Sequence, residues 1–257
     1  MVNSRRSLAA AAFFVIISAG MAETSSAAFL SGLKKLKTPG AMLASEGVNV
    51  TGELELRSDY VWRGYTLDPD AVLQHGFGLN SKGFTLVYWA NWDFIRKGII
   101  DSNELDFSFD YTRNFGGASL SAGTIYYGFY GLERTSRELY AGIELNKLPL
   151  TPGIVYYYDY SNGRTKYLSV EASRELVINA KKNLSLWLGG RAGFGENVIE
   201  DGKSGEFVLS AELEFPVLKK LSMGLSASRS VPFEESTAGG VLREKTLSAG
   251  VSLSTNF

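Results

Sequence analysis

Carboxylates recur at every second position in several stretches of the chain. Glu53, Glu55 and Asp59 share such alternate positions with Arg57, and Asp106 and Asp110 share them with Ser108. Residues two apart lie on the same face of a β-strand, so these side chains would line one surface. Carboxylates at that density need water or cations beside them, because an unpaired buried charge is costly. The spacing therefore predicts an acidic, hydrated surface that attracts cations.

The residue types that many enzymes use for proton transfer or metal binding are scarce. The chain has no Cys and a single His, His75, which excludes a thiol nucleophile, a Cys-type zinc site and any site with two imidazoles. His75 is the one candidate base for a Ser–His pair, and no Ser lies two residues after it. Asp68, Asp70 and Asp101 could hold a divalent cation, but solvated loop acids explain them more simply. We expect no enzyme, no cofactor and no metal.

Charge and composition exclude further classes. The chain of 257 residues carries 26 basic against 27 acidic side chains, and its pI is near 6.0. This balance leaves no basic surface for nucleic acid, so we expect no such partner. The 28 Gly, 13 Tyr and 15 Phe are an unusual set for a compact soluble domain.

The first residues resemble an export signal. Arg5 and Arg6 precede an apolar run over 8–17, and small residues follow, which is typical of a cleaved signal peptide over 1–28. Cleavage is expected after Ala22 or after Ala28, and 29–47 would then form a periplasmic linker. The alternative is an uncleaved N-terminal anchor.

From residue 48 to the end, apolar and polar side chains alternate, as in strands whose two faces meet different surroundings. The alternation predicts twelve strands, and each is long enough, with its flanks, for the roughly 9–11 residues of a tilted membrane strand. The predicted segments lie within 48–62, 71–79, 84–94, 105–111, 118–122, 139–145, 154–160, 168–172, 184–194, 207–215, 221–227 and 247–257.

The connections and the aromatic residues support a membrane barrel. Short and long connections mostly alternate along the chain, although the one at Asn162-Gly163 is tight where a long loop is expected. This alternation is typical of outer-membrane barrels and places both termini on the periplasmic side. Aromatic residues fall near both ends of the segments, as in interfacial belts: Trp62, Phe94, Tyr160, Phe194 and Phe207 near the long loops, and Phe84, Phe115, Phe215 and Phe257 near the short turns. We therefore predict an all-β fold, a 12-stranded antiparallel transmembrane β-barrel over 48–257. A soluble β-sandwich or lipocalin-like barrel is the competing fold.

One stretch resembles a known family. The residues Ser58-Asp59-Tyr60-Val61-Trp62-Arg63-Gly64, followed by Pro69, Ala71, Gln74 and Gly76, resemble the first hairpin of the TorF-like porins, also described as the Gcw_chp group of outer-membrane proteins. The match covers 52–95, with Leu73 and His75 interrupting the family's pattern. The resemblance implies an outer-membrane location and a barrel fold, and a porin-like role. A terminal Phe257 is what the barrel-insertion machinery commonly recognises.

The polar face of the predicted barrel would line its lumen. Twelve strands give a bore between the filled barrels of about eight strands and the open porins of about sixteen. Glu138, Glu171 and Glu206 share that face with the residues that we predict to line a pore: Glu53, Glu55, Arg57, Asp59, Arg63, Asp93, Glu104, Asp106, Asp110, Glu144, Asp159, Arg191, Glu212 and Glu214.

Two functions remain open. The first is passive diffusion of small hydrophilic solutes or cations through an acidic channel in the outer membrane. The second is a closed barrel that binds or braces the envelope through its external loops. The loop over 230–245 would serve either function, as a constriction that folds inward or as a binding lid.

Overall fold

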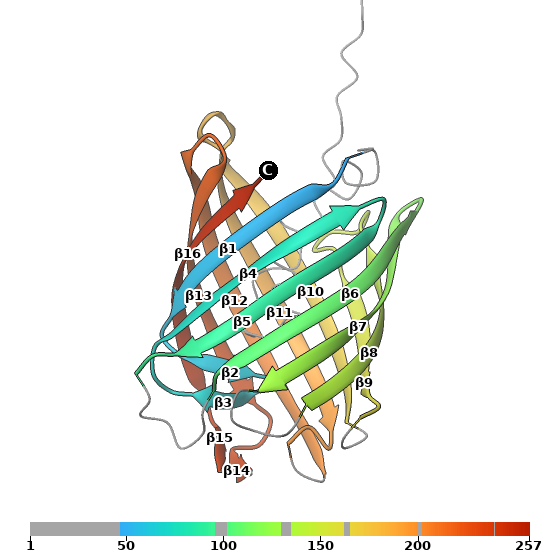
Figure 1. The fold of residues 1–257 in the computed structure, drawn as a ribbon, viewed down its shortest axis with the longest axis vertical. Helices are drawn as coiled ribbons and strands as arrows, with labels where there is room; N and C mark the ends of the chain where they lie inside the picture. The colour runs from blue at the N-terminus through green and yellow to red at the C-terminus, as the bar shows by residue number, and fades with distance from the viewer. Residues whose placement is uncertain (1–46, 96–101, 130–134, 162–164, 200–201, 239) are drawn as a thin grey trace, which may run out of the picture.

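The computed structural model describes residues 47–95, 102–129, 135–161, 165–199, 202–238 and 240–257 (Figure 1). The expected signal peptide over 1–28 and the linker, apart from residue 47, lie outside the described residues. Within the described residues, no helix is long and apolar enough to cross a membrane.

Twelve antiparallel strands close into one barrel, as the alternation predicted. Each strand pairs with its neighbour along the chain, and β1 pairs with β16 to complete the ring. The barrel strands are β1 (Asn49–Arg57), β4 (Val72–Ser81), β5 (Phe84–Asp93), β6 (Glu104–Phe115), β7 (Ala118–Phe129), β8 (Thr135–Leu145), β9 (Gly153–Asp159), β10 (Lys166–Asn179), β11 (Leu184–Glu196), β12 (Lys203–Leu218), β13 (Leu221–Pro232) and β16 (Thr246–Asn256). Closure leaves no strand edge unpaired, which a hydrocarbon environment requires.

The outer surface of the barrel is apolar. On β1, the outward side chains of Leu54 and Leu56 are 45% and 48% exposed, whereas Arg57, an inward residue at the end of the strand, is buried. The same arrangement holds around the ring: large apolar side chains face outward and polar side chains face inward, the reverse of a soluble barrel. A soluble barrel would bury these apolar groups, so this surface is suited to lipid. The competing fold, a soluble β-sandwich or a lipocalin-like barrel, therefore does not describe this structure.

The two ends of the barrel differ. Both termini of the barrel lie at one end, called here the short-turn end, where the connections between strands span two to seven residues; the 3-10 helix η1 (Ala180–Lys182) lies in one of these connections. The other, long-loop end carries the connection between β1 and β4 and the one between β13 and β16 (Figure 1). The predicted alternation of short and long connections holds only in part, because the connections after β7, β9 and β11 at the long-loop end span five or six residues.

A second, four-stranded sheet is built from the two longest connections. It consists of β2 (Tyr60–Trp62), β3 (Tyr65–Asp68), β14 (Ser236–Ala238) and β15 (Val241–Arg243), in the order β14-β15-β3-β2. The first predicted strand was wrong beyond residue 57, because β1 ends at Arg57 and the chain then leaves the barrel wall. Trp62 was wrongly expected in an aromatic belt, since it packs against Tyr127 inside the barrel.

Candidate functional site: the lumen and its inserted hairpin

The segment Tyr60–Asp68, called here the inserted hairpin, turns sharply at two residues. Arg63 and Gly64 have φ of 49° and 79°, and Trp62 pairs with Tyr65 across them. Positive φ at both central residues matches the type I′ turn, which suits the twist of a two-residue hairpin. A Cβ on Gly64 would lie 3.0 Å from Cβ of Glu206, so the glycine also permits close approach to the barrel wall. The Arg-Gly pair thus forms the tip of the hairpin.

The inserted hairpin crosses the bore. It leaves the wall at β1, and its tip contacts the opposite wall, since Tyr157 of β9 lies six strands from β1 around the ring. Trp62 packs on Tyr127 of β7, and Gly64 lies against Glu206 of β12. These contacts place the hairpin across the long-loop half of the lumen (Figure 1).

Arg63 is the main anchor of the inserted hairpin. Its Nη1 and Nη2 donate to Oε1 and Oε2 of Glu138 at 2.7 and 2.8 Å. Its guanidinium also lies over the rings of Trp62, Tyr157 and Tyr167, at 4.5, 5.0 and 4.3 Å from their centroids. Burial lowers the pKa of Arg63, but the Glu138 carboxylate more than offsets this, so the pKa lies above its ordinary value. The side chain is therefore a permanent cation, bound in a bidentate pair by the Glu138 carboxylate and packed against aromatic faces.

Tyr60 anchors the base of the inserted hairpin. Its hydroxyl donates to Glu104 of β6, and its ring packs edge-on against Trp89 at 6.0 Å. Burial, followed by the nearby Glu104 and Asp106 carboxylates, raises the pKa of Tyr60 well above its usual range. The hydroxyl therefore keeps its proton and remains a donor at physiological pH.

The strand β3 is covered by the hairpin of β14 and β15. Leu242 pairs with Thr66, and Val241 packs with Tyr65. Arg243 donates to the Gly205 carbonyl at 2.9 Å and lies over the Tyr65 ring at 4.9 Å. Within the loop over 230–245, β15 thus packs on the inserted hairpin, whereas residues 233–237 are exposed at the long-loop end (Figure 1).

Glu206, like Glu138, places a carboxylate beside the hairpin tip. It is fully buried, accepts from the Tyr167 hydroxyl and accepts from Nη2 of Arg191 at 3.2 Å. Gly193 leaves room for this pair, because a Cβ there would overlap both Glu206 and Tyr167. The wall around the tip is therefore built from closely fitted polar groups.

The predicted pore-lining residues divide by position. Asp59 and Arg63 lie in the connection between β1 and β4 instead of on the barrel wall, because the chain leaves the wall at Arg57. The other twelve lie on the inner wall, which also carries Glu138, Glu171, Glu175 and Glu206. The inward wall acids in the long-loop half are buried: Asp93, Glu104, Asp106, Asp110, Glu138, Asp159 and Glu206. Those that are partly exposed are Glu53, Glu55, Glu144, Glu171, Glu175, Glu212 and Glu214.

Bases on the inner wall are few. Among the inward residues of the described strands, only Arg57 and Arg191 are cationic. Arg57 donates to Glu55 at 2.9 Å, and Glu55 also accepts from Ser226. The wall beneath the inserted hairpin is thus acidic and partly open to solvent.

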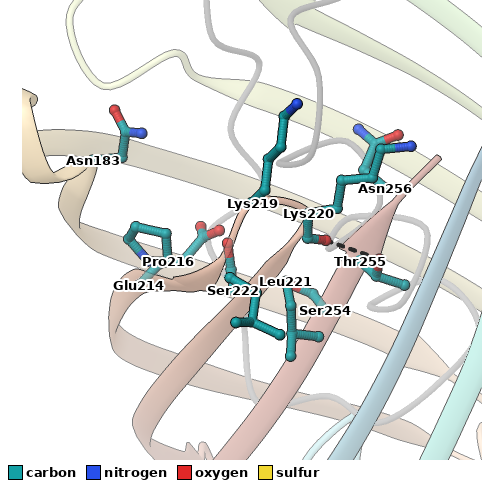
Figure 2. Close-up of a pocket in the computed structure, with 11 residues that line it drawn as sticks. Asn183, Glu214, Pro216, Lys219, Lys220, Leu221, Ser222, Ser254, Thr255 and Asn256 are labelled. Atoms are coloured by element: carbon teal, nitrogen blue, oxygen red, sulfur yellow. Dashed lines mark hydrogen bonds between the residues drawn. The ribbon is translucent and has the colours of Figure 1, made fainter.

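The short-turn mouth contains a cavity of about 400 Å³. Figure 2 shows Glu214 and Ser222 on the wall below this cavity, and Lys219 and Lys220 in the turn at its rim. Thr255 donates to the Lys220 carbonyl at 2.8 Å, which ties this turn to β16. The short-turn end is therefore open beside β12, β13 and β16, whereas the inserted hairpin crosses the long-loop half.

The remaining sequence candidates lie elsewhere. His75 contacts the Tyr88 hydroxyl at 3.2 Å and the Trp92 ring at 4.7 Å, on the outward face of β4. Asp68 accepts from the Ser102 hydroxyl at 2.7 Å and from the Asp70 amide, while Asp101 lies outside the described residues. Both carboxylate oxygens of Asp68 therefore accept hydrogen bonds from within the protein.

Sequence reasoning missed the aromatic residues around the tip, Tyr127, Tyr157 and Tyr167. Only Tyr157 lies within a predicted segment, where alternation places it on the polar face; Tyr127 and Tyr167 lie beyond the predicted bounds 118–122 and 168–172. The convergence of all three depends on barrel closure. The Arg63-Gly64 pair between Trp62 and Tyr65 was the available signal for the hairpin.

Comparisons with known proteins concern the fold. No protein-family model and no curated protein matches the sequence. The structure is similar to that of the NanC porin, with a TM-score of 0.54 and 12% identity over 81% of this chain and 99% of that one. It also matches the COG4313 outer membrane channel from Pseudomonas putida F1, with a TM-score of 0.47 and 12% identity over 86% of this chain and 100% of that one. The chain therefore has the closed-barrel fold of outer-membrane proteins.

Proposed function

We propose that the protein is a porin-like channel of the bacterial outer membrane that passes small hydrophilic solutes and prefers cations. The observation that carries this proposal is the charge of the inner wall, where acids far outnumber Arg57 and Arg191. Rings of carboxylates in a narrow aqueous bore raise the local concentration of cations and repel anions. The lipid-facing outer surface and the hollow short-turn mouth agree with this role.

The inserted hairpin is the constriction of this channel. Its tip spans the bore and is anchored by Arg63 and Tyr60, so conduction depends on its displacement or on narrow passages beside it. The hairpin is joined to the wall mainly by side chains, whereas the barrel strands are joined by continuous ladders of backbone hydrogen bonds. We therefore expect the hairpin to undock without unfolding of the barrel.

A second function has its own support. The buried ion pair between Arg63 and Glu138 and the covering strands β14 and β15 suit a permanently closed barrel. Such a protein would act through its long-loop end as a binding or structural protein of the envelope. A properly folded barrel that conducts no current, even without the hairpin, would favour this alternative.

Location and family follow as proposals. The fold, the basic-then-apolar start of the chain and the terminal Phe257 support export with a cleaved signal peptide and delivery to the barrel-insertion machinery. Membership of the TorF-like porins is supported by the motif over 58–64, since its Arg-Gly pair forms the hairpin tip. If the protein belongs to this family, the motif over 58–64 would form the hairpin that narrows the channel.

Neutralising the partly exposed acids should remove the cation preference. We expect Glu53→Gln/Glu212→Gln/Glu214→Gln to shift the reversal potential in a salt gradient toward zero, because these wall carboxylates attract cations. Planar-bilayer recordings of the refolded barrel measure this shift. The matched control is Glu196→Gln/Glu234→Gln/Glu235→Gln, which removes three exposed charges outside the lumen, one on the outward face of β11 and two in the connection after β13, and should leave the potential unchanged. An equal shift in both variants would contradict selectivity at the wall.

The docked hairpin should be favoured at acid pH. Burial, aided by nearby Asp93 and Asp70, raises the pKa of Asp68 above its ordinary 3.8, despite hydrogen bonds from Ser102 and Asp70. A raised pKa means that protonation stabilises docking, and this stabilisation is lost as pH rises through the docked value. We expect the open fraction to fall as pH approaches 4. Asp68→Asn should flatten this dependence, whereas an unaltered pH profile in Asp68→Asn would exclude Asp68 as its source.

A further inference from the structure

The groups that hold the Arg63 guanidinium belong mostly to the barrel wall. Glu138, Tyr157 and Tyr167 contact the guanidinium, Tyr127 bonds Glu138, and Glu206 bonds Tyr167 and lies beside Gly64. We name these five residues, from β7, β8, β9, β10 and β12, the guanidinium cradle. Within the cradle, Glu138 forms the bidentate pair with Arg63, and the Tyr127 hydroxyl donates to the same carboxylate at 3.0 Å. The cradle therefore persists on the wall when the inserted hairpin moves away.

An empty cradle is electrostatically unfavourable. Glu138 is 2% exposed, and removing the cation from a buried ion pair leaves its carboxylate charge without compensation, which is strongly unfavourable. A cation from solution that replaces Arg63 offsets this cost. Undocking of the hairpin is therefore coupled to binding of a cation at the same place.

The geometry of the cradle selects among cations. Two carboxylate oxygens at 2.7 and 2.8 Å from two guanidinium nitrogens match a planar fork, which an ammonium group cannot supply. The Tyr157 and Tyr167 rings, 5.0 and 4.3 Å from the guanidinium carbon, suit a flat, weakly hydrated cation.

A separate observation also indicates a ligand. Oε2 of Glu206 is buried, and no hydrogen-bond donor among the described residues reaches it. It lies beside the hairpin tip, where a Cβ on Gly64 would be 3.5 Å from it. A buried acceptor without a donor is rare in folded proteins. A solute that occupies the space of the tip would offer it a donor that the glycine lacks.

We propose that the guanidinium cradle binds solutes bearing a guanidinium group, which compete with Arg63 and thereby favour the undocked hairpin. Glu138 receives the fork, Tyr157 and Tyr167 cover its faces, Tyr127 orients Glu138, and Glu206 accepts a further donor. The inference deepens the proposed channel function by naming its substrate class, and it rests on that function only for transport. Binding itself is independent of conduction.

Binding is tested with the refolded Arg63→Ala barrel, using argininamide as the probe and lysinamide as a comparator of equal charge. We expect argininamide to bind Arg63→Ala at least tenfold more tightly than lysinamide, as measured by the ligand-dependent rise in the temperature of heat-induced unfolding. The wild-type barrel should bind argininamide more weakly, because Arg63 occupies the cradle. Arg63→Ala/Glu138→Gln should lose the preference. Equal affinity for both amides in Arg63→Ala would overturn the proposal.

A second measurement does not depend on the folding of Arg63→Ala. Since the chain has no Cys, Thr66→Cys introduces a single thiol at a buried site on the hairpin. We expect argininamide to accelerate maleimide labelling of this thiol several-fold more than lysinamide does. Equal acceleration would contradict guanidinium recognition. Selective labelling or binding in a barrel that passes no current would leave the cradle intact and contradict the channel function alone.

Discussion

Replacing Arg63 by alanine is expected to raise the single-channel conductance several-fold. The substitution removes the bidentate pair with Glu138 and the contacts with three aromatic rings, which together fix the tip of the inserted hairpin. Loss of one partner from a buried ion pair costs about 3–5 kcal/mol, and the Glu138 charge that remains favours water entry over redocking. At about 1.4 kcal/mol for each tenfold change, the ratio of docked to undocked hairpin falls by a factor of about 10² or more.

The control for this variant is Arg113→Ala. Arg113 is an exposed arginine near the short-turn end that lies over the Phe115 ring at 5.1 Å, and it makes no contact with the hairpin among the described interactions. We expect its conductance to match that of the wild-type barrel. Recordings in which Arg63→Ala also conducts like the wild type would exclude the hairpin anchor as the determinant of closure.

A disulfide between β3 and β16 is expected to reverse the effect of Arg63→Ala. The hydroxyl oxygens of Thr66 and Thr246 are 3.0 Å apart, so cysteines at both positions would place their sulfur atoms within reach of one another. The chain has no other Cys, so no competing disulfide forms. Oxidised Arg63→Ala/Thr66→Cys/Thr246→Cys should conduct poorly because the bond holds β3 against the wall.

Reduction provides the internal comparison for the disulfide. Dithiothreitol should restore the large conductance of the triple variant within the same membrane, and it should leave Arg63→Ala/Thr66→Cys unchanged. An oxidised triple variant that conducts as well as the reduced one would show that the open path does not depend on displacement of β3.

The barrel was predictable because lipid and lumen impose opposite demands on alternate residues. Leu54 and Glu55 illustrate this, since one meets hydrocarbon and the next meets the lumen. The same rule failed beyond Arg57. Ser58, Tyr60 and Trp62 continue the period of two, and periodicity contains no information about where a strand leaves the wall.

The site was only partly predictable for a related reason. Alternation placed Glu138 and Glu206 on the inner face, but their contacts with the hairpin cross the bore between strands that are far apart around the ring. Such contacts follow from closure and diameter, which emerge only when all twelve strands are assembled. The covering of β3 by β15 depends on the meeting of two loops that are distant in sequence.

The central claim is that the inserted hairpin closes an acid-lined bore, and replacement of Asp59–Asp70 by a short Gly-Ser linker tests it most directly. The measurement is single-channel current of the refolded variant and of the wild type under a salt gradient, after heat-modifiability has verified both barrels. We predict a several-fold larger conductance in the variant, with a reversal potential of cation sign. A variant that conducts no better than the wild type, or that prefers anions, would contradict the account.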